Sequence, residues 1–167
     1  LANLPLLPEV LSGKDWLLDN AGYIAGVYRT EHPREIVLDN GLVRRTFRTV
    51  PNGATIEYRN LTTGEHLLRG VKPEATVTVD GHTYAVGGLI GQPNYAFLTP
   101  AWVEDLQSDP DALRFTGYET GPIEARMAWE RVRHHAPDVV WPPKGVHLRM
   151  DYATPPSAAH ALAVSVH

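Results

Sequence analysis

Alternating apolar and polar residues run through most of the chain and predict β-strands. The clearest case is a pair of runs, Ala75–Val79 and His82–Val86, which flank the dipeptide Asp80-Gly81. Both runs are rich in β-branched or aromatic residues, and an Asp-Gly pair suits the positive φ angles of a type I′ turn. The sequence therefore predicts a two-stranded hairpin here.

Residues 146–152 predict an antiparallel strand with one buried and one solvated face. The apolar residues occupy every second position: Val146, Leu148, Met150 and Tyr152. The polar residues between them are His147, Arg149 and Asp151. Because successive side chains on a strand point to opposite faces, the apolar set lies on one side. Such one-sided strands are typical of antiparallel sheets.

Shorter apolar runs bounded by turn residues predict further strands, at residues 36–38, 42–49, 55–59, 113–120 and 123–132. Turns are predicted at Asp39-Asn40-Gly41, at Pro51-Asn52-Gly53 and over residues 60–64. Residues 162–167 also alternate and predict a strand at which the chain stops. We expect the natural protein to continue beyond it, because a domain seldom ends inside its own strand.

Helix is scarce in the predicted fold. Residues 99–106 predict one short helix, with Thr99 as N-cap, Pro100 at the first helical position and acidic residues in the first turns. Residues 7–16 have room for a short turn. A strand and a turn about every 8–12 residues is the spacing of a sandwich or barrel. The sequence predicts an all-β, antiparallel β-sandwich with at most one or two short helices, forming a single domain over residues 1–167.

Composition and charge narrow the function classes. The 167 residues are 43% hydrophobic and 20% charged, as in ordinary globular proteins. The 15 basic residues are outnumbered by 19 acidic ones, and no aromatic residues alternate with the short basic groups, so we expect no nucleic-acid partner. No apolar run approaches the roughly 20 residues of a membrane span. The lack of cysteine excludes disulfides, thiolate metal sites and a Cys nucleophile.

The motifs of catalysis and metal binding are weak. The pair His134 and His135, with Asp138 nearby, suggests a metal, but neighbouring strand residues point to opposite faces and no further ligand is fixed by spacing. We therefore expect no metal and no other cofactor. No serine lies in a Gly-x-Ser-x-Gly elbow. Four glutamates on predicted strands are interpreted as solvated or cross-strand ion-paired residues: Glu57, Glu119, Glu124 and Glu130. We assign no catalytic residue.

Aromatic residues are the remaining binding candidates. Trp129 shares a predicted strand face with Met127 and is expected in the core. Trp141 and Tyr95 lie in predicted loops, where they either line a cleft or plug the end of the sandwich. The buried interpretation is favoured, because large aromatics are usually well buried. The candidates for a carbohydrate-facing or barrel-facing surface are Tyr95, Trp102, His134, His135, Asp138 and Trp141.

Five stretches carry a family resemblance: residues 39–47 (DNGLVRRTF), 51–55 (PNGAT), 60–65 (NLTTGE), 87–95 (GGLIGQPNY) and 133–145 (RHHAPDVVWPPKG). In these stretches the chain resembles the N-terminal region of bacterial α-galactosidase-like proteins. These resemble retaining glycoside hydrolases in which a β-supersandwich, similar to the galactose-mutarotase-like fold, precedes a (β/α)8 barrel.

The resemblance implies that the catalytic carboxylates lie on that barrel, beyond His167, and that this domain packs on it. The implied partner is a C-terminal catalytic domain of the same polypeptide, and the implied location is extracytoplasmic, with a signal peptide outside this chain.

Three functional hypotheses follow. An accessory domain docked on a barrel predicts an exposed apolar patch. An independent carbohydrate-binding module needs a row of solvent-facing aromatics, whereas Tyr95, Trp102 and Trp141 are scattered in sequence. A self-contained, mutarotase-like epimerase would use a His acid and a Glu base, with His134, His135 and Glu130 as the residues to test.

Overall fold

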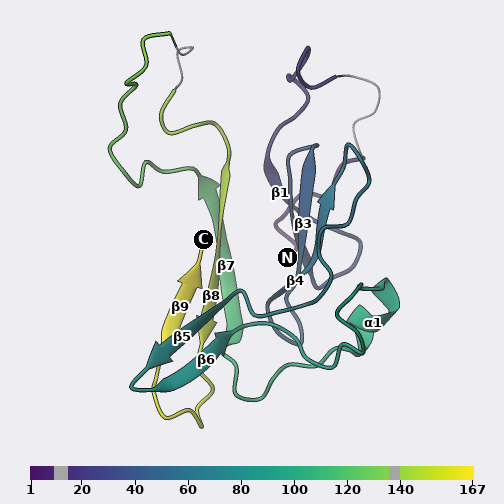
Figure 1. The fold of residues 1–167 in the computed structure, drawn as a ribbon, viewed down its shortest axis with the longest axis vertical. Coiled ribbons are helices and arrows are strands. Elements are labelled where there is room, and N and C mark those ends of the chain that lie inside the picture. Colours follow the sequence, from purple (N-terminus) through teal and green to yellow (C-terminus); the bar gives the residue numbers. More distant parts are fainter. Residues whose placement is uncertain (10–14, 136–139) are drawn as a thin grey trace.

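The computed structural model describes residues 1–9, 15–135 and 140–167, and it consists of three antiparallel sheets (Figure 1). The first sheet has four strands in chain order: β1 (Gly26–Arg29), β2 (Glu35–Asp39), β3 (Val43–Arg48) and β4 (Ala54–Asn60). The second is a hairpin of β5 (Ala75–Val79) and β6 (His82–Val86). The third has three strands: β7 (Arg114–Pro122), β8 (Val146–Ala153) and β9 (Ala163–Val166).

The main core lies between the four-stranded and the three-stranded sheets. Ile36 and Phe47 contribute from the first sheet, and Leu148, Met150 and Tyr152 contribute from alternate positions of β8. The hairpin lies across the lower end of the three-stranded sheet in the view of Figure 1 and adds its own apolar residues to the same cluster. These features confirm the predicted all-β, antiparallel sandwich, including the one-sided strand β8.

The predicted Asp-Gly hairpin is confirmed. Val79 pairs with His82, and the two residues between them, Asp80 and Gly81, have φ angles of 49° and 81°. Both angles are positive, as a type I′ turn requires. The strand at the end of the sequence is also confirmed, because β9 pairs with β8 from Ala163 to Val166.

The two Asn-containing turns in the first sheet are confirmed, and they are stabilised differently. At residues 39–41, the Asp39 carboxylate accepts the Gly41 N–H at 2.7 Å, which is a local Asx turn. At residues 51–53, the Asn52 side chain is buried and bonds to Leu113 and Phe115 at the start of β7. The second turn therefore ties the first sheet to the third.

Helix α1 (Pro100–Asp105) is confirmed, with Pro100 at its start. Thr99 is the N-cap residue, as predicted, although its side chain makes no capping hydrogen bond. One detail of the prediction is wrong, because the acidic residues Glu104 and Asp105 lie at the end of this six-residue helix, not in its first turn. Glu104 is held instead by an ion pair with Arg48 of β3. Among the described residues, no helix is long and apolar enough to cross a bilayer.

The predicted strand at residues 123–132 is wrong, because this stretch is irregular. The ladder between β7 and β8 ends at the pair Pro122 and Val146, so no strand is available to pair with the residues that follow. Proline also lacks the N–H that a ladder needs. Met127 is 64% exposed and Trp129 is exposed as well, so Trp129 does not lie in the core as predicted.

Candidate functional site

The aromatic candidates Tyr95 and Trp102 lie in different environments. Tyr95 is 47% exposed, and its ring lies under the ammonium group of Lys72, 4.0 Å from the ring centroid. Trp102 is a half-buried residue of α1 that stacks on Phe97, with 5.1 Å between the ring centroids. Tyr95 therefore makes a cation–π contact with Lys72, whereas Trp102 packs against the loop that precedes its own helix.

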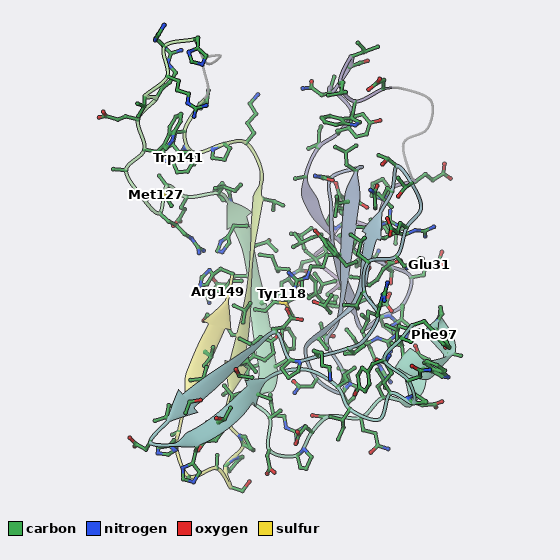
Figure 2. All side chains as sticks on the ribbon, in the orientation of Figure 1. Glu31, Phe97, Tyr118, Met127, Trp141 and Arg149 are labelled. Carbon is green, nitrogen blue, oxygen red and sulfur yellow. The ribbon has the colours of Figure 1, made fainter. Side chains whose placement is uncertain are left out.

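Trp141 lies far from both of them, in the long connection between β7 and β8 (Figure 2, where Phe97 and Trp141 are labelled on opposite sides). It pairs with Trp129, with 5.6 Å between the ring centroids, and its indole N–H donates to the Met127 carbonyl at 3.2 Å. Trp141 is 40% exposed. The interpretation of Tyr95 and Trp141 as buried plugs is wrong, and the structure does not bring the three aromatic candidates together.

The histidine candidates are placed by a turn and not by a strand. His134 and His135 are both exposed, and their rings meet edge to face with centroids 5.4 Å apart. Asp138 lies outside the described residues. Over residues 1–9, 15–135 and 140–167, no group of three or more His, Asp or Glu side chains is arranged to hold a metal ion.

The four glutamates considered for catalysis are separated from one another. Glu119 of β7 faces Arg149 across the ladder and pairs with it at 3.0 Å, which confirms the predicted cross-strand ion pair. Glu57 accepts a bond from the Thr46 hydroxyl at 2.8 Å. Glu124 and Glu130 lie in the irregular segment. Glu57 and Glu119 therefore each have a partner on a neighbouring strand.

Exposed apolar residues gather on the connection between β7 and β8, of which residues 123–135 and 140–145 are described; we call these residues the β7–β8 segment. Its exposed large apolar side chains are Met127, Trp129, Val132, Val140 and Trp141. A pocket of about 300 Å³ lies at the base of the segment, between Trp141, Val146 and His147. Residues 15–25 project from the same end of the sandwich (Figure 1) and expose Leu17, Leu18 and Ile24.

A larger cavity, about 630 Å³, lies between the first sheet, residues 68–74 and Val146. Its wall holds an ion pair between Arg45 and Glu74, whose side chain is only 4% exposed. The Glu74 carboxylate also accepts bonds from the Thr55 N–H at 2.7 Å and the Thr55 hydroxyl at 2.6 Å. Sequence reasoning missed this site, because Arg45 and Glu74 lie 29 residues apart and belong to no motif.

Tyr152 is the most buried titratable residue of the sandwich core. Burial, and secondarily the charge of Glu74, raises the pKa of the Tyr152 phenol. Its hydroxyl is buried and has no hydrogen-bond partner among the described residues. Such a phenol stays protonated at physiological pH, and the Tyr152 ring packs edge to face against Phe115 in the core.

Arg48 organises a second charged cluster, beside a smaller cavity of about 270 Å³. Its guanidinium donates to Glu35 at 3.1 Å and to Glu104 at 2.7 Å, which joins β2 and β3 to α1. The hydrogen bond from Arg48 lowers the pKa of Glu104. Because one guanidinium holds a carboxylate from the sheet and another from the helix, this arrangement fixes α1 on the sheet.

We expect the contribution of Glu104 to stability to disappear in acid. A carboxylate whose pKa is lowered by folding stabilises the native state above its ordinary pKa, and this contribution falls as the pH drops through the lowered value. Glu104 is 55% exposed, so the effect is less than about 1 kcal/mol. Urea unfolding at neutral and acidic pH should show that Glu104→Gln lowers the free energy of unfolding only at neutral pH. Glu31→Gln, at an exposed carboxylate, is the control. Equal effects of both substitutions at neutral pH would contradict the assignment.

These observations place an apolar surface at one end of the sandwich and a charged cavity between the first sheet and residues 68–74. The aromatic and histidine candidates do not form one site, since they are divided among three parts of the described chain. A comparison of the chain with protein-family models, curated proteins and solved structures gives no match.

Proposed function

We propose that this chain is a non-catalytic accessory domain, which packs on a catalytic barrel outside the chain and shapes its sugar site. The parent protein would be an extracytoplasmic glycoside hydrolase similar to the α-galactosidase-like proteins. The observation that carries the proposal is the exposed apolar surface of the β7–β8 segment. An accessory domain separated from its partner exposes such a surface.

The exposure on this segment is energetically unfavourable for an isolated domain. Val132 is 93% exposed, and Met127 and Val140 are also largely in solvent. Covering apolar surface stabilises a contact by about 25 cal/mol per Å². Residues 123–135 and 140–145 belong to none of the three sheets, so their apolar side chains are not covered by a neighbouring strand. Both properties support a docking role for the segment.

The aromatic geometry favours docking over independent sugar binding. Trp129 and Trp141 are tilted by 39° to each other, so they do not offer one flat platform for a sugar ring. Tyr95 and Trp102 lie on other parts of the molecule and do not extend a row. The remaining hypothesis, a His and Glu epimerase, has weaker support, since His134 and His135 are exposed in a turn.

The test uses the full polypeptide that contains this chain and its catalytic domain. We expect the double substitution Met127→Ser and Val132→Ser to lower hydrolysis of a nitrophenyl α-galactoside on the order of tenfold, because small displacements at a sugar site are costly. We also expect calorimetry to show that the two domains then unfold separately. The matched control replaces Leu67 and Ile90, two exposed apolar residues elsewhere, by Ser.

Equal activity and a single unfolding transition in both double variants would overturn the docking proposal. Binding of galactose by this chain alone, abolished by Trp141→Ala, would instead support a carbohydrate-binding module.

A further inference from the structure

The 630 Å³ cavity contains two carboxylates, and both oxygens of each already accept hydrogen bonds from the protein. One Asp39 oxygen accepts the Gly41 N–H at 2.7 Å, and the other accepts Arg44 Nε at 2.7 Å. Glu74 accepts from Thr55 and from Arg45 in the same way. Each carboxylate is ion-paired with an arginine, so neither offers an unpaired negative charge to a ligand.

The groups that remain around this cavity are hydrogen-bond donors. The Lys72 ammonium makes no hydrogen bond or ion pair with any described residue, and it lies over the Tyr95 ring. Asn40 uses its side-chain oxygen for the N–H groups of Leu42 and Val43, which leaves its NH₂ group free. The Tyr58 hydroxyl is likewise unpaired within the described chain. The Lys72 ammonium and the Asn40 NH₂ group can only donate, so a ligand that supplies acceptors fits this wall.

The charges around the cavity leave an excess of one positive charge. Asp39 is neutralised by Arg44, and Glu74 is neutralised by Arg45. Lys72 is the remaining charged residue of the lining. A monoanion such as a carboxylate matches this balance, whereas a phosphate, with nearly two charges at neutral pH, does not.

The rest of the lining is apolar and suits more than a bare ion. Leu38, Val43, Leu68 and Val146 supply side chains that can contact the C–H groups of a ring. The volume lies within the range of about 300–1,000 Å³ that is usual for small-molecule sites. A polar edge of donors beside an apolar wall is suited to a hydroxylated ring that carries one carboxylate.

We propose that this cavity binds a sugar-sized monoanionic hydroxycarboxylate of the hexuronate class, with its carboxylate on Lys72 and its hydroxyl oxygens on Asn40 and Tyr58. This site contains none of the exposed apolar residues of the β7–β8 segment, although Val146 lines both this cavity and the pocket at the base of that segment. Tyr95 is a positioning residue, because its ring holds the ammonium of Lys72 at 4.0 Å. Tyr95, which the sequence offered as a sugar-facing aromatic, would thus contribute by holding Lys72 in place.

The test is isothermal titration of the chain with D-galacturonate, D-galactose and inorganic phosphate. Galactose keeps the ring and replaces the carboxylate by a neutral CH₂OH group. We expect galacturonate to bind at least about tenfold more tightly than galactose or phosphate, since a hydrogen bond to a charged group is worth this much or more. Lys72→Met should weaken galacturonate binding by a similar factor. Lys144→Met, which removes an exposed cation outside the cavity lining, should leave it unchanged.

The role of Tyr95 has its own control. We expect Tyr95→Leu to weaken galacturonate binding, and we expect Tyr95→Phe, which keeps the aromatic face, to retain it. Circular dichroism of each variant checks that the fold is intact. The proposal is overturned if galacturonate does not bind, if galactose or phosphate binds as tightly, or if Lys72→Met and Lys144→Met have the same effect.

Discussion

Gly87→Ala is expected to destabilise the protein by about 3 kcal/mol or more. A methyl group on Gly87 would lie 2.2 Å from the Gly53 carbonyl oxygen and 2.7 Å from the Tyr152 ring. The Gly53 carbonyl is backbone, and it is held in place because it accepts the Gly88 N–H at 2.8 Å. Neither neighbour can move without disturbing the core. The φ angle of Gly87, +63°, adds the strain of a left-handed conformation.

Gly81→Ala separates these two contributions. Gly81 has a φ angle of +81°, but nothing lies within 4 Å of the position that its Cβ would take. This substitution should cost only about 1 kcal/mol, from the backbone conformation alone. The measurement is urea unfolding of both variants, followed by circular dichroism. If the two substitutions cost the same, the close packing at Gly87 has no energetic consequence and the interpretation is wrong.

The position of Gly87 illustrates which parts of the fold sequence reasoning can reach. The hairpin that it follows was predictable, because its strand residues and its Asp-Gly turn are neighbours in sequence. The need for a glycine at residue 87 comes from Gly53 and Tyr152, which approach it from two other parts of the chain. Local patterns carry no information on such contacts.

The strand predicted at residues 123–132 is wrong for a different reason, because the local pattern was present but the strand was not. The spacing of apolar residues there, including Met127 and Trp129, satisfies the strand pattern, but a strand also needs a partner. The ladder has already ended at Pro122. The apolar residues that the pattern assigned to the core are therefore those that form the exposed surface of the β7–β8 segment.

The candidate sites were predictable only in part. Tyr95 and Trp141 were selected from the sequence as loop aromatics that could contact a carbohydrate, and both side chains are exposed. The donors of the large cavity, Asn40, Tyr58 and Lys72, come from separate segments, and each is an ordinary polar residue in sequence. Their common property, hydrogen-bonding capacity left unused, depends on what the neighbouring carboxylates bind. It becomes visible only in three dimensions.

Asn52→Asp is expected to destabilise the protein by about 3 kcal/mol, because Asn52 connects two sheets through a buried amide. The side chain is 1% exposed. Its NH₂ group donates to the Leu113 carbonyl at 2.9 Å, and its oxygen accepts the Phe115 N–H at 2.8 Å. An ionised carboxylate keeps the acceptor but places a second oxygen against the Leu113 carbonyl. The variant therefore loses one buried hydrogen bond and buries a charge, and each change costs roughly 1–3 kcal/mol or more.

The penalty should depend on pH in a way that identifies its cause. Burial raises the pKa of the new carboxyl above that of an unfolded Asp, so the variant loses stability as the pH rises through the raised value. In acid the protonated carboxyl can donate to the Leu113 carbonyl, and the cost should shrink.

Asn60→Asp is the matched control, because Asn60 is less buried and only its side-chain oxygen is engaged, by the Thr62 N–H at 2.9 Å. It should change the free energy of unfolding by less than about 0.5 kcal/mol. Urea unfolding of both variants at neutral pH and at about pH 4 measures the difference, since Asp ionises in this range. A cost for Asn52→Asp that is small, or that stays the same at both pH values, would mean that this amide does not hold the two sheets together.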